Sequence, residues 1–344
     1  MPEPHLVSNA VVALLFGAGL AAGVAVRRNR LWRQAAGELW RRRPLALGVV
    51  ALYVLLALAD SVAWVGGPGA GSDVVATHEP RSLVDRAFSG IAEPQASYSA
   101  PFAAAEFYAP YRPLAHPGRH PLGTDILGRD VLRLTVKGAR VALLIGGLTS
   151  LIAIPLALLL GVSAGYFGGR IDDAVFFVMS TLASMPGLLL LIALIMVMGR
   201  STLSVCIALG VTSWVGFSRI ARGETLKLRE LDYVQAARAL GVSEPRIVAR
   251  HVLPNLMHLV IITFVLMFSG LVLSEAILSW LGIGVDGSWG QMIDQARDEL
   301  SREPIIWWNI SAAGTALFGL ILAINFVGDA LRDILDPRTQ RERQ

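Results

Sequence analysis

The sequence predicts an all-α, polytopic membrane protein, and its composition, its long apolar runs and the spacing within those runs all indicate this class. Hydrophobic residues make up 54% of the 344 positions and charged residues only 16%, whereas a soluble domain contains about 25% charged residues. The apolar runs show no period-two alternation. Helices are therefore favoured over barrel strands, because a helix satisfies its own backbone hydrogen bonds in lipid.

Seven runs are apolar and long enough to cross a bilayer, which requires about 20 such residues per helix. The seven runs are 6–26, 45–65, 141–165, 174–198, 201–221, 257–281 and 305–327. The first is predicted to be a retained anchor rather than a signal peptide, because its basic cluster follows the apolar run.

The charge distribution predicts an orientation in the membrane. Segment 27–44 carries seven arginines and one acid. If this segment lies in the cytoplasm, segments 166–173 and 222–256 and the tail 329–344 lie there too, and the four together hold 18 Lys and Arg. The short segments on the other side hold three. The positive-inside rule therefore predicts an external N-terminus and a cytoplasmic C-terminus.

Residues 66–140 are predicted to form a long external loop between the second and third spans. Its first part, 66–120, is rich in Gly, Pro, Ala and Ser, which indicates irregular chain. In the second part, 122–140, four basic residues recur at helical spacing and predict an amphipathic helix at the membrane surface: Arg129, Arg133, Lys137 and Arg140. This basic face has two interpretations, a solvated face leading into the next span or a docking surface for an external partner.

A short polar segment, 222–256, separates two apolar runs and contains a predicted helix at 233–241. Ala236 and Ala237 are small and favour helix, and Gly241 is placed to end the helix in the left-handed conformation. A helix of this size can press into a groove on a partner. Ser243 is then expected to cap a second helix, and Pro254 to interrupt the chain before the next span.

Motifs for catalysis by this chain are missing from the sequence. A phosphate-binding GxxxxGK[ST] loop does not occur, so we do not expect this chain to hydrolyse ATP itself. The six histidines and the single cysteine, Cys206, form no metal-ligand pattern, and HExxH is absent. No metal site, resident cofactor or catalytic residue is predicted.

Several residues within the predicted spans are candidates for a pore or gate. Pro186, next to Ser184, is predicted to bend span 174–198 and free a backbone carbonyl. Glu275 is the one acid deep in a predicted span, with a structural or gating role favoured over cargo contact. The GxxxG spacings that join Gly161, Gly165 and Gly169 are interpreted as close helix packing.

Five motifs in order resemble one transporter family and cover residues 120 to 340. The first is Leu122-Gly-Thr-Asp-Ile-Leu-Gly-Arg-Asp-Val-Leu132, which contains Gly123, Asp125, Gly128, Arg129 and Asp130. The others are Asp232-Tyr-Val-Gln-Ala-Ala-Arg-Ala-Leu-Gly241 with His251-Val-Leu-Pro-Asn255, Ser274-Glu-Ala-Ile-Leu-Ser-Trp-Leu-Gly282, Ser288-Trp-Gly-Gln-Met292 and Gly328-Asp-Ala-Leu-Arg-Asp-Ile-Leu-Asp-Pro-Arg338. Together they resemble the C-type permeases of the dipeptide/oligopeptide/nickel family of ABC importers.

The resemblance implies a six-helix type I importer core formed by 45–65 and the later spans in 141–328. Segment 6–26 is an extra helix with no family role. Segment 222–256 resembles the family's EAA loop. This resemblance implies coupling to an ATPase through Tyr233, Gln235, Ala236, Ala237, Arg238, Leu240 and Gly241. It also implies that His251, Pro254 and Asn255 shape the loop. Gln235 replaces the family's motif glutamate.

The resemblance also implies the partners and the location. We expect a second homologous permease, two cytoplasmic ABC ATPases that hold ATP and Mg, an extracytoplasmic substrate-binding protein and the lipid of a bacterial inner membrane, with no nucleic acid. Peptides are the expected cargo, with nickel or another small solute as the alternative. A secondary transporter and a membrane scaffold or sensor are the competing classes. The first would show inverted repeats, and none is convincing here.

Overall fold

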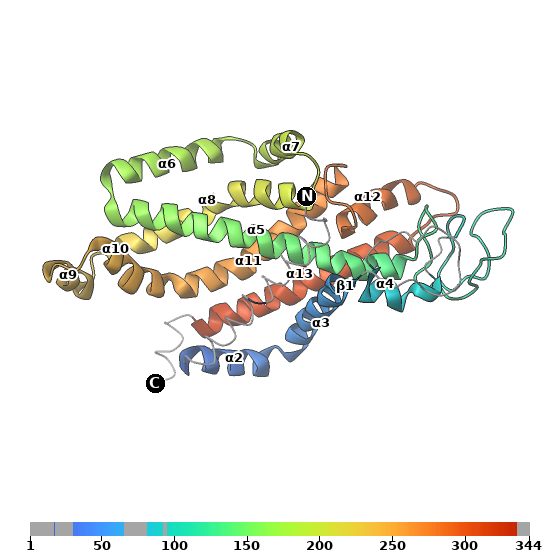
Figure 1. Cartoon of the computed structure of the whole chain (residues 1–344), viewed down its shortest axis with the longest axis horizontal. Coiled ribbons are helices and arrows are strands. Elements are labelled where there is room, and N and C mark those ends of the chain that lie inside the picture. The colour runs from blue at the N-terminus through green and yellow to red at the C-terminus, as the bar shows by residue number, and fades with distance from the viewer. Residues whose placement is uncertain (1–16, 18–29, 65–80, 92–94, 336–344) are drawn as a thin grey trace. The chain divides into compact units, whose positions relative to one another are not determined.

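A computed structural model describes residue 17 and residues 30–64, 81–91 and 95–335, and these residues form mostly helices (Figure 1). The all-α class is confirmed. The strands among these residues are β1 (Ala63–Trp64) and β2 (Arg81–Ser82), an antiparallel pair in which Ala63 is opposite Ser82. The predicted helix 6–26 lies outside the described residues. The chain divides into two compact units, 1–144 with 272–327 and 145–271 with 328–344.

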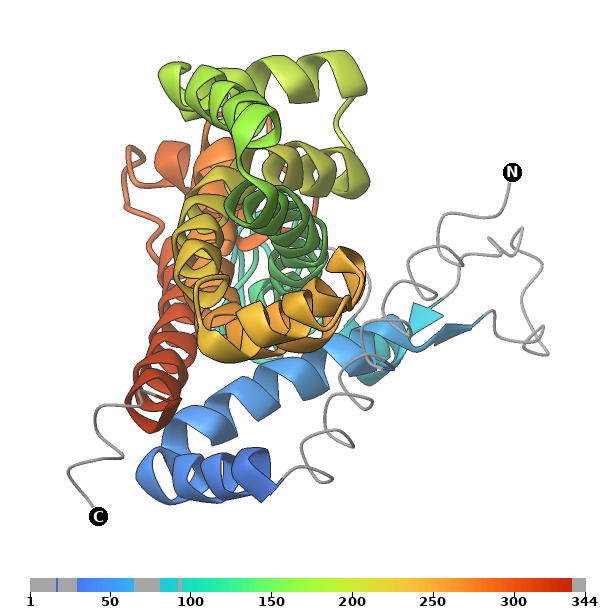
Figure 2. The ribbon, with the colours of Figure 1, turned by 90° about the vertical axis from the view of Figure 1, so that its left-hand side faces the viewer.

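The first unit begins with helices α2 (Arg30–Arg42) and α3 (Pro44–Ser61), which meet at an angle and are drawn in blue in Figure 2. Pro44 occupies the first turn of α3, where its missing N–H costs no hydrogen bond. The strand pair follows, then α4 (Leu83–Ala87) and the 3₁₀ turn η1 (Ser89–Ile91). A capping box starts α4, because the Ser82 hydroxyl accepts from the Asp85 N–H and the Asp85 carboxylate accepts from the Ser82 N–H.

Trp289 at the start of α12 (Trp289–Glu299) is buried and contacts two other helices of the first unit. Its indole N–H donates to the Thr135 carbonyl at 2.8 Å, and its ring lies 5.7 Å from that of Tyr53 on α3. Tyr53 in turn donates to the Ala316 carbonyl of α13 (Trp308–Leu335) at 2.8 Å. These contacts connect four helices, since Thr135 belongs to α5 (Val131–Phe167).

The second unit holds the rest of α5, α6 (Gly169–Ser184), α7 (Gly187–Met198), α8 (Thr202–Leu228) and most of α11 (Leu253–Trp280). A Cβ at Gly161 would lie 2.5 Å from the Ser218 carbonyl oxygen, and one at Gly165 2.7 Å from the Arg222 carbonyl oxygen. These two glycines therefore allow α5 and α8 to approach closely, as predicted. Gly169 has no such neighbour and starts α6 with a φ of 52°.

Five described helices are long and apolar enough to cross a membrane, or six if one bent pair is counted as a span. The bent pair is α6 and α7, which meet at 93°, and Figure 1 shows α7 nearly end-on where α6 lies lengthwise. The predicted bend at Pro186 within 174–198 is therefore confirmed. The cause is Pro186, which sits immediately before α7 and has no N–H to continue α6.

Helix boundaries also differ from the prediction elsewhere. The first core span ends at Ser61 rather than 65, and the last helix extends to Leu335 rather than 327. The expected helix over 122–140 begins only at Val131 and continues as α5. Residues 122–130 form turns instead, because Gly123 and Gly128 have positive φ values of 71° and 68°.

Candidate functional site

The predicted helix in the polar segment 222–256 is present as α9 (Asp232–Ala239), which is followed by α10 (Glu244–Ile247) (Figure 1). Gly241 adopts a φ of 75°, which a side chain would oppose. Its N–H donates to the Arg238 carbonyl at 3.0 Å, and the Val242 N–H donates to the Ala237 carbonyl at 3.1 Å. This pair of bonds is a Schellman motif, so the end of α9 is fixed by the left-handed glycine.

One face of α9 is buried and the other is open. Val234 is 0% exposed and belongs to an apolar cluster with Tyr166, Leu228, Ile247, Val252 and Leu256. Ala237 and Val242 pack against the same cluster. By contrast Gln235, Ala236 and Arg238 are exposed, and Leu240 at the helix end is 84% exposed. The buried face of α9 thus packs against its own unit, and the exposed face and the helix end present a small apolar surface to the solvent.

Two polar side chains of α9 fix its position against neighbouring helices. The Gln235 amide donates to the Arg229 carbonyl at the end of α8, at 2.9 Å. An ionised glutamate could only accept at this position, so the replacement of the motif glutamate provides a donor. The Tyr233 hydroxyl accepts from the Asn255 amide at 3.1 Å, and the same amide also donates to the His251 carbonyl at 2.6 Å.

The chain between α9 and α11 corrects two predictions. Ser243 occupies the cap position of α10 but makes no side-chain capping bond. Pro254 does not interrupt the chain, because α10 leads through the π-helical turn η2 (Val248–Val252) into α11 without a break. In the π turn the Leu253 N–H bonds to the Val248 carbonyl. This wider turn gives the proline ring room that an α-helical turn would deny.

The signature loop, residues 122–130, is held by a buried carboxylate. Asp125 is 0% exposed and accepts from the Leu127 and Arg129 N–H groups at 3.0 and 2.8 Å. The Arg129 guanidinium completes the set with bonds of 2.8 and 2.7 Å to the other oxygen. At Gly128 a Cβ would lie 1.9 Å from the Gln95 carbonyl oxygen, so residues 122–130 pack directly on the backbone of the preceding loop.

The last residue of this loop, Asp130, starts α5. One of its oxygens accepts from the Arg133 N–H at 2.8 Å, and the other pairs with His120 Nδ1 at 2.8 Å. The second ring nitrogen of His120 lies 3.2 Å from the Gln95 amide nitrogen, while the Gln95 oxygen accepts from the Ala115 N–H. Because the Gln95 nitrogen must donate, His120 accepts with Nε2 and carries its proton on Nδ1.

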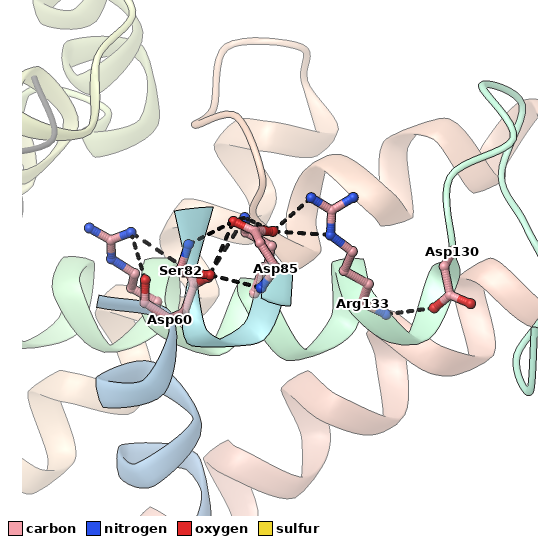
Figure 3. A network of polar contacts seen from close by, with 7 residues as sticks. Asp60, Ser82, Asp85, Asp130 and Arg133 are labelled. Carbon is pink, nitrogen blue, oxygen red and sulfur yellow. Dashed lines mark hydrogen bonds and ion pairs between the residues drawn. The ribbon is translucent and has the colours of Figure 1, made fainter. Parts of the chain in front are cut away.

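The basic face of α5 binds carboxylates of the same chain. Arg133 and Lys137 contact Asp85 on α4 at 2.7 and 2.8 Å, and Arg140 lies 3.6 Å from Asp60 at the end of α3. Figure 3 shows Asp60, Ser82 and Asp85 gathered beside α5, with Ser82 donating to Asp60 at 2.8 Å. We name Asp60, Ser82 and Asp85, together with the cations Arg133, Lys137 and Arg140, the carboxylate clamp.

The clamp bears on the two interpretations of the basic face, because its cations have carboxylate partners within the same chain. Of the four basic residues of this face, Arg133, Lys137 and Arg140 connect α5 to α3 and α4. The fourth, Arg129, binds Asp125. Burial disfavours the charged form of Asp85, but hydrogen bonds from Lys137 and Arg133 outweigh this effect and hold its pKa well below the usual range. The sequence pattern identified these cations but missed Asp60 and Asp85, which are distant along the chain.

The carboxylate of Asp85 should therefore make stability depend on pH. Because its folded pKa lies below the unfolded one, its contribution is present above the unfolded pKa of about 3.9 and is lost as the pH falls below it. We expect Asp85→Asn to lower the free energy of unfolding at pH 7 by about 1–3 kcal/mol. In detergent, the unfolding temperature of this variant should fall less steeply with decreasing pH than that of the wild type.

The matched control for this clamp variant is Asp298→Asn in the same unit. Asp298 is 81% exposed and lies 3.8 Å from its arginine partner, so its loss should leave the profile unchanged. A profile for Asp85→Asn that coincides with the wild type would contradict the stabilising role of the clamp.

The predicted pore or gate residues belong to different units of the described structure. Ser184 is the last residue of α6, and its hydroxyl donates to the Thr181 carbonyl at 2.8 Å, while Pro186 precedes α7. Glu275 belongs to the first unit, is 3% exposed and accepts from the Ser279 hydroxyl at 2.5 Å. Ser279 also contacts the Ser288 hydroxyl that caps α12, so Glu275 connects the end of α11 to α12.

In the described part of the chain, no group of three or more His, Cys, Asp or Glu side chains is arranged to hold a metal ion. The features that the described residues do show are apolar spans, one sharp break between α6 and α7, and a short helix, α9, with a fixed end and an exposed face. Such features are those of a multi-pass helical membrane protein.

Comparison with known proteins specifies the family. Residues 157–341 match the family described as "Binding-protein-dependent transport system inner membrane component". A putative peptide transport system permease of Brucella suis is 34% identical over 312 residues, which are 89% of this chain and 92% of the relative. The chain therefore belongs to the family of binding-protein-dependent transport system inner membrane components.

Two further relatives match 64% of the chain each. The dipeptide transport system permease protein DppC of Bacillus subtilis is 37% identical over 225 residues, covering 64% of this chain and 70% of the relative. The oligopeptide transport system permease protein OppC of Haemophilus influenzae is 34% identical over 224 residues, covering 64% and 71%. Membership of this family places the chain in a multi-subunit transporter of the inner membrane, and it sets aside the secondary-transporter and scaffold alternatives.

Proposed function

We propose that this chain forms half of the translocation pore of an ATP-driven importer for peptides. The transport of dipeptides and oligopeptides by the named relatives supports this cargo over nickel or another small solute. The second half of the pore is a homologous permease. An extracytoplasmic binding protein delivers the peptide, and the membrane spans switch between two openings.

The observation that carries the coupling role is the open face of α9. A short helix with its buried face fixed by Val234 and its end fixed by Gly241 offers Ala236 and the 84% exposed Leu240 to a partner. An exposed leucine surrounded by small residues fits an apolar cleft on another protein. We infer that this cleft belongs to an ABC ATPase subunit.

The ATPase subunits supply the chemistry in this proposal. Two of them bind ATP and Mg, and this chain holds neither, which agrees with the missing GxxxxGK[ST] motif. The excess of basic residues in 27–44 and 222–256 supports a cytoplasmic location for α9, together with an external N-terminus and a cytoplasmic C-terminus.

The test is a change of the exposed leucine. Leu240→Asp places a charge where an apolar contact is proposed but disturbs no buried group, so the chain should fold and lose its ATPase subunits. Affinity purification through a tag on this chain measures how much ATPase is retained. We expect retention to fall about tenfold or more, since buried apolar contacts carry most of an interface's energy.

The control for the retention experiment is Leu127→Asp. Leu127 is also an exposed leucine, at 58%, but it lies in the signature loop. Retention of ATPase by the Leu127 variant and not by the Leu240 variant supports the proposal. Equal retention by both variants rejects α9 as the docking element.

A further inference from the structure

The end of α9 is connected to a membrane span by three side chains from three helices. The Tyr166 hydroxyl, in the last turn of α5, donates to one oxygen of the Glu244 carboxylate on α10. The other oxygen pairs with Arg238 of α9 at 3.2 Å. The Arg238 guanidinium lies 5.5 Å from the centre of the Tyr166 ring. We name Tyr166, Arg238 and Glu244 the tyrosine link.

Burial shows which contact of the link is the strongest. The Arg238 and Glu244 side chains are 41% and 43% exposed, and ion pairs at such sites contribute little because water screens them. Tyr166 is 3% exposed and packs in the same apolar cluster as Val234. Its hydroxyl bond to a carboxylate is charge-assisted and partly shielded, and it is therefore the strongest polar contact of the three.

The other polar contacts of α9 reach different helices. Gln235 bonds to the end of α8, and Tyr233 bonds to Asn255 on α11. Among the contacts described above, the tyrosine link is the one that joins α9 to α5 through side-chain polar groups. A second bond, from the Arg229 guanidinium to the Gly165 carbonyl at 3.0 Å, joins the end of α8 to the same turn of α5.

We propose that Tyr166 is a positioning residue that transmits movement of α9 to α5. This inference rests on the proposed coupling role of α9. When a partner pulls or turns α9, Arg238 and Glu244 move with it, and the bond from Glu244 carries the displacement to the end of α5. The apolar cluster keeps α9 and α5 together, while the polar link fixes the direction in which they move.

The decisive variant is Tyr166→Phe, which removes the hydroxyl but keeps the ring in the cluster and beneath Arg238. The ATPase subunits should stay bound, because the exposed face of α9 is unchanged. We expect uptake of a labelled dipeptide per ATP hydrolysed to fall about fivefold or more in proteoliposomes containing the whole complex, a change typical of lost coupling between sites.

A second variant makes the test independent of the tyrosine. Glu244→Gln removes the charge at an exposed position, and it should lower the same ratio. The double variant should be no worse than Tyr166→Phe alone, because both substitutions act on the Tyr166–Glu244 bond, which Tyr166→Phe already removes. The control is Lys227→Gln, which breaks an exposed ion pair within α8, at 2.8 Å from Glu224, and should leave the ratio unchanged.

The possible results separate this inference from the coupling role itself. If Leu240→Asp releases the ATPase and Tyr166→Phe and Glu244→Gln keep the wild-type ratio, the tyrosine link is rejected and the coupling role remains. If Leu240→Asp does not release the ATPase, the coupling role is rejected, and the inference about the tyrosine link is rejected with it. A parallel drop in ATPase activity, uptake and thermal stability, with an unchanged ratio, would assign Tyr166 a structural role only and also reject the inference.

Discussion

Replacement of Gly241 by proline should abolish peptide-stimulated ATP hydrolysis and uptake by the assembled transporter. Proline fixes φ near −65°, whereas Gly241 has a φ of 75°, and proline also lacks the N–H that donates to the Arg238 carbonyl. The cost of about 3 kcal/mol or more falls on the last turn of α9. Assays on the purified complex in proteoliposomes, with its binding protein and peptide present, measure both activities.

Two further variants at Gly241 distinguish the effect of backbone strain at this residue from a failure of the whole protein to fold or assemble. Gly241→Asn should retain most activity, because asparagine tolerates the left-handed conformation. Gly241→Ala should be intermediate, with a cost of about 1–2 kcal/mol. Size-exclusion chromatography establishes whether each variant still assembles. If the proline variant assembles and keeps full stimulated activity, the end of α9 has no part in coupling.

A leucine at Gly161 should produce the largest loss of stability among the substitutions considered. A Cβ at this site would lie 2.5 Å from the Ser218 carbonyl oxygen and 3.0 Å from the Ser218 hydroxyl. The first contact is to backbone of α8, which cannot rotate away, so α5 and α8 must separate. Overpacking typically costs about 1–3 kcal/mol, and backbone separation adds to it. Thermal unfolding of the detergent-purified protein should show a midpoint lowered by several degrees.

The control for this substitution is Gly223→Ala on α8. A Cβ at Gly223 meets no atom within 4 Å, so alanine should leave the midpoint unchanged or raise it slightly through its better helix propensity. Gly161→Ala should fall between the control and Gly161→Leu, since it adds one methyl to the same contact. Equal midpoints for Gly161→Leu and the control would show that α5 and α8 tolerate separation.

Local signals in the sequence predicted much of the site because they act through adjacent backbone. Gly241 ends α9 as expected, since only its own φ and two nearby hydrogen bonds are involved. Pro186 breaks its span for a similar reason, through the N–H that it lacks. Apolar runs identified the spans because bilayer thickness sets their length.

Partners distant along the chain were not predictable in the same way. The basic residues of α5 were visible as a periodic pattern, but Asp60 and Asp85 come from other helices and have no spacing relation to them. Tyr166 ends an apolar run, and nothing local indicates that its hydroxyl meets Glu244. The sequence thus indicated which groups need a partner, while the fold decided which partner each one finds.

The spacing of side chains along the sequence predicted the wrong local structure where an unusual backbone conformation lies close to a helix. Arg129 is in phase with the basic residues of α5, yet it belongs to a turn because Gly128 has a positive φ. Pro254 suggested a break, but a wider helical turn accommodates it. In both places one neighbouring backbone conformation overrides a side-chain pattern.

The π turn η2 (Val248–Val252) has a consequence for how this segment tolerates insertion and deletion. A π turn is equivalent to one extra residue in an α-helix, and each residue turns the helix by about 100°. Deleting one residue from 248–252 would restore α-helical winding and leave the phase of α10 about the axis of α11 nearly unchanged, because the wide turn already absorbs the extra residue. The π turn therefore allows this segment to hold one extra residue without a change in the phase of α10 about the axis of α11.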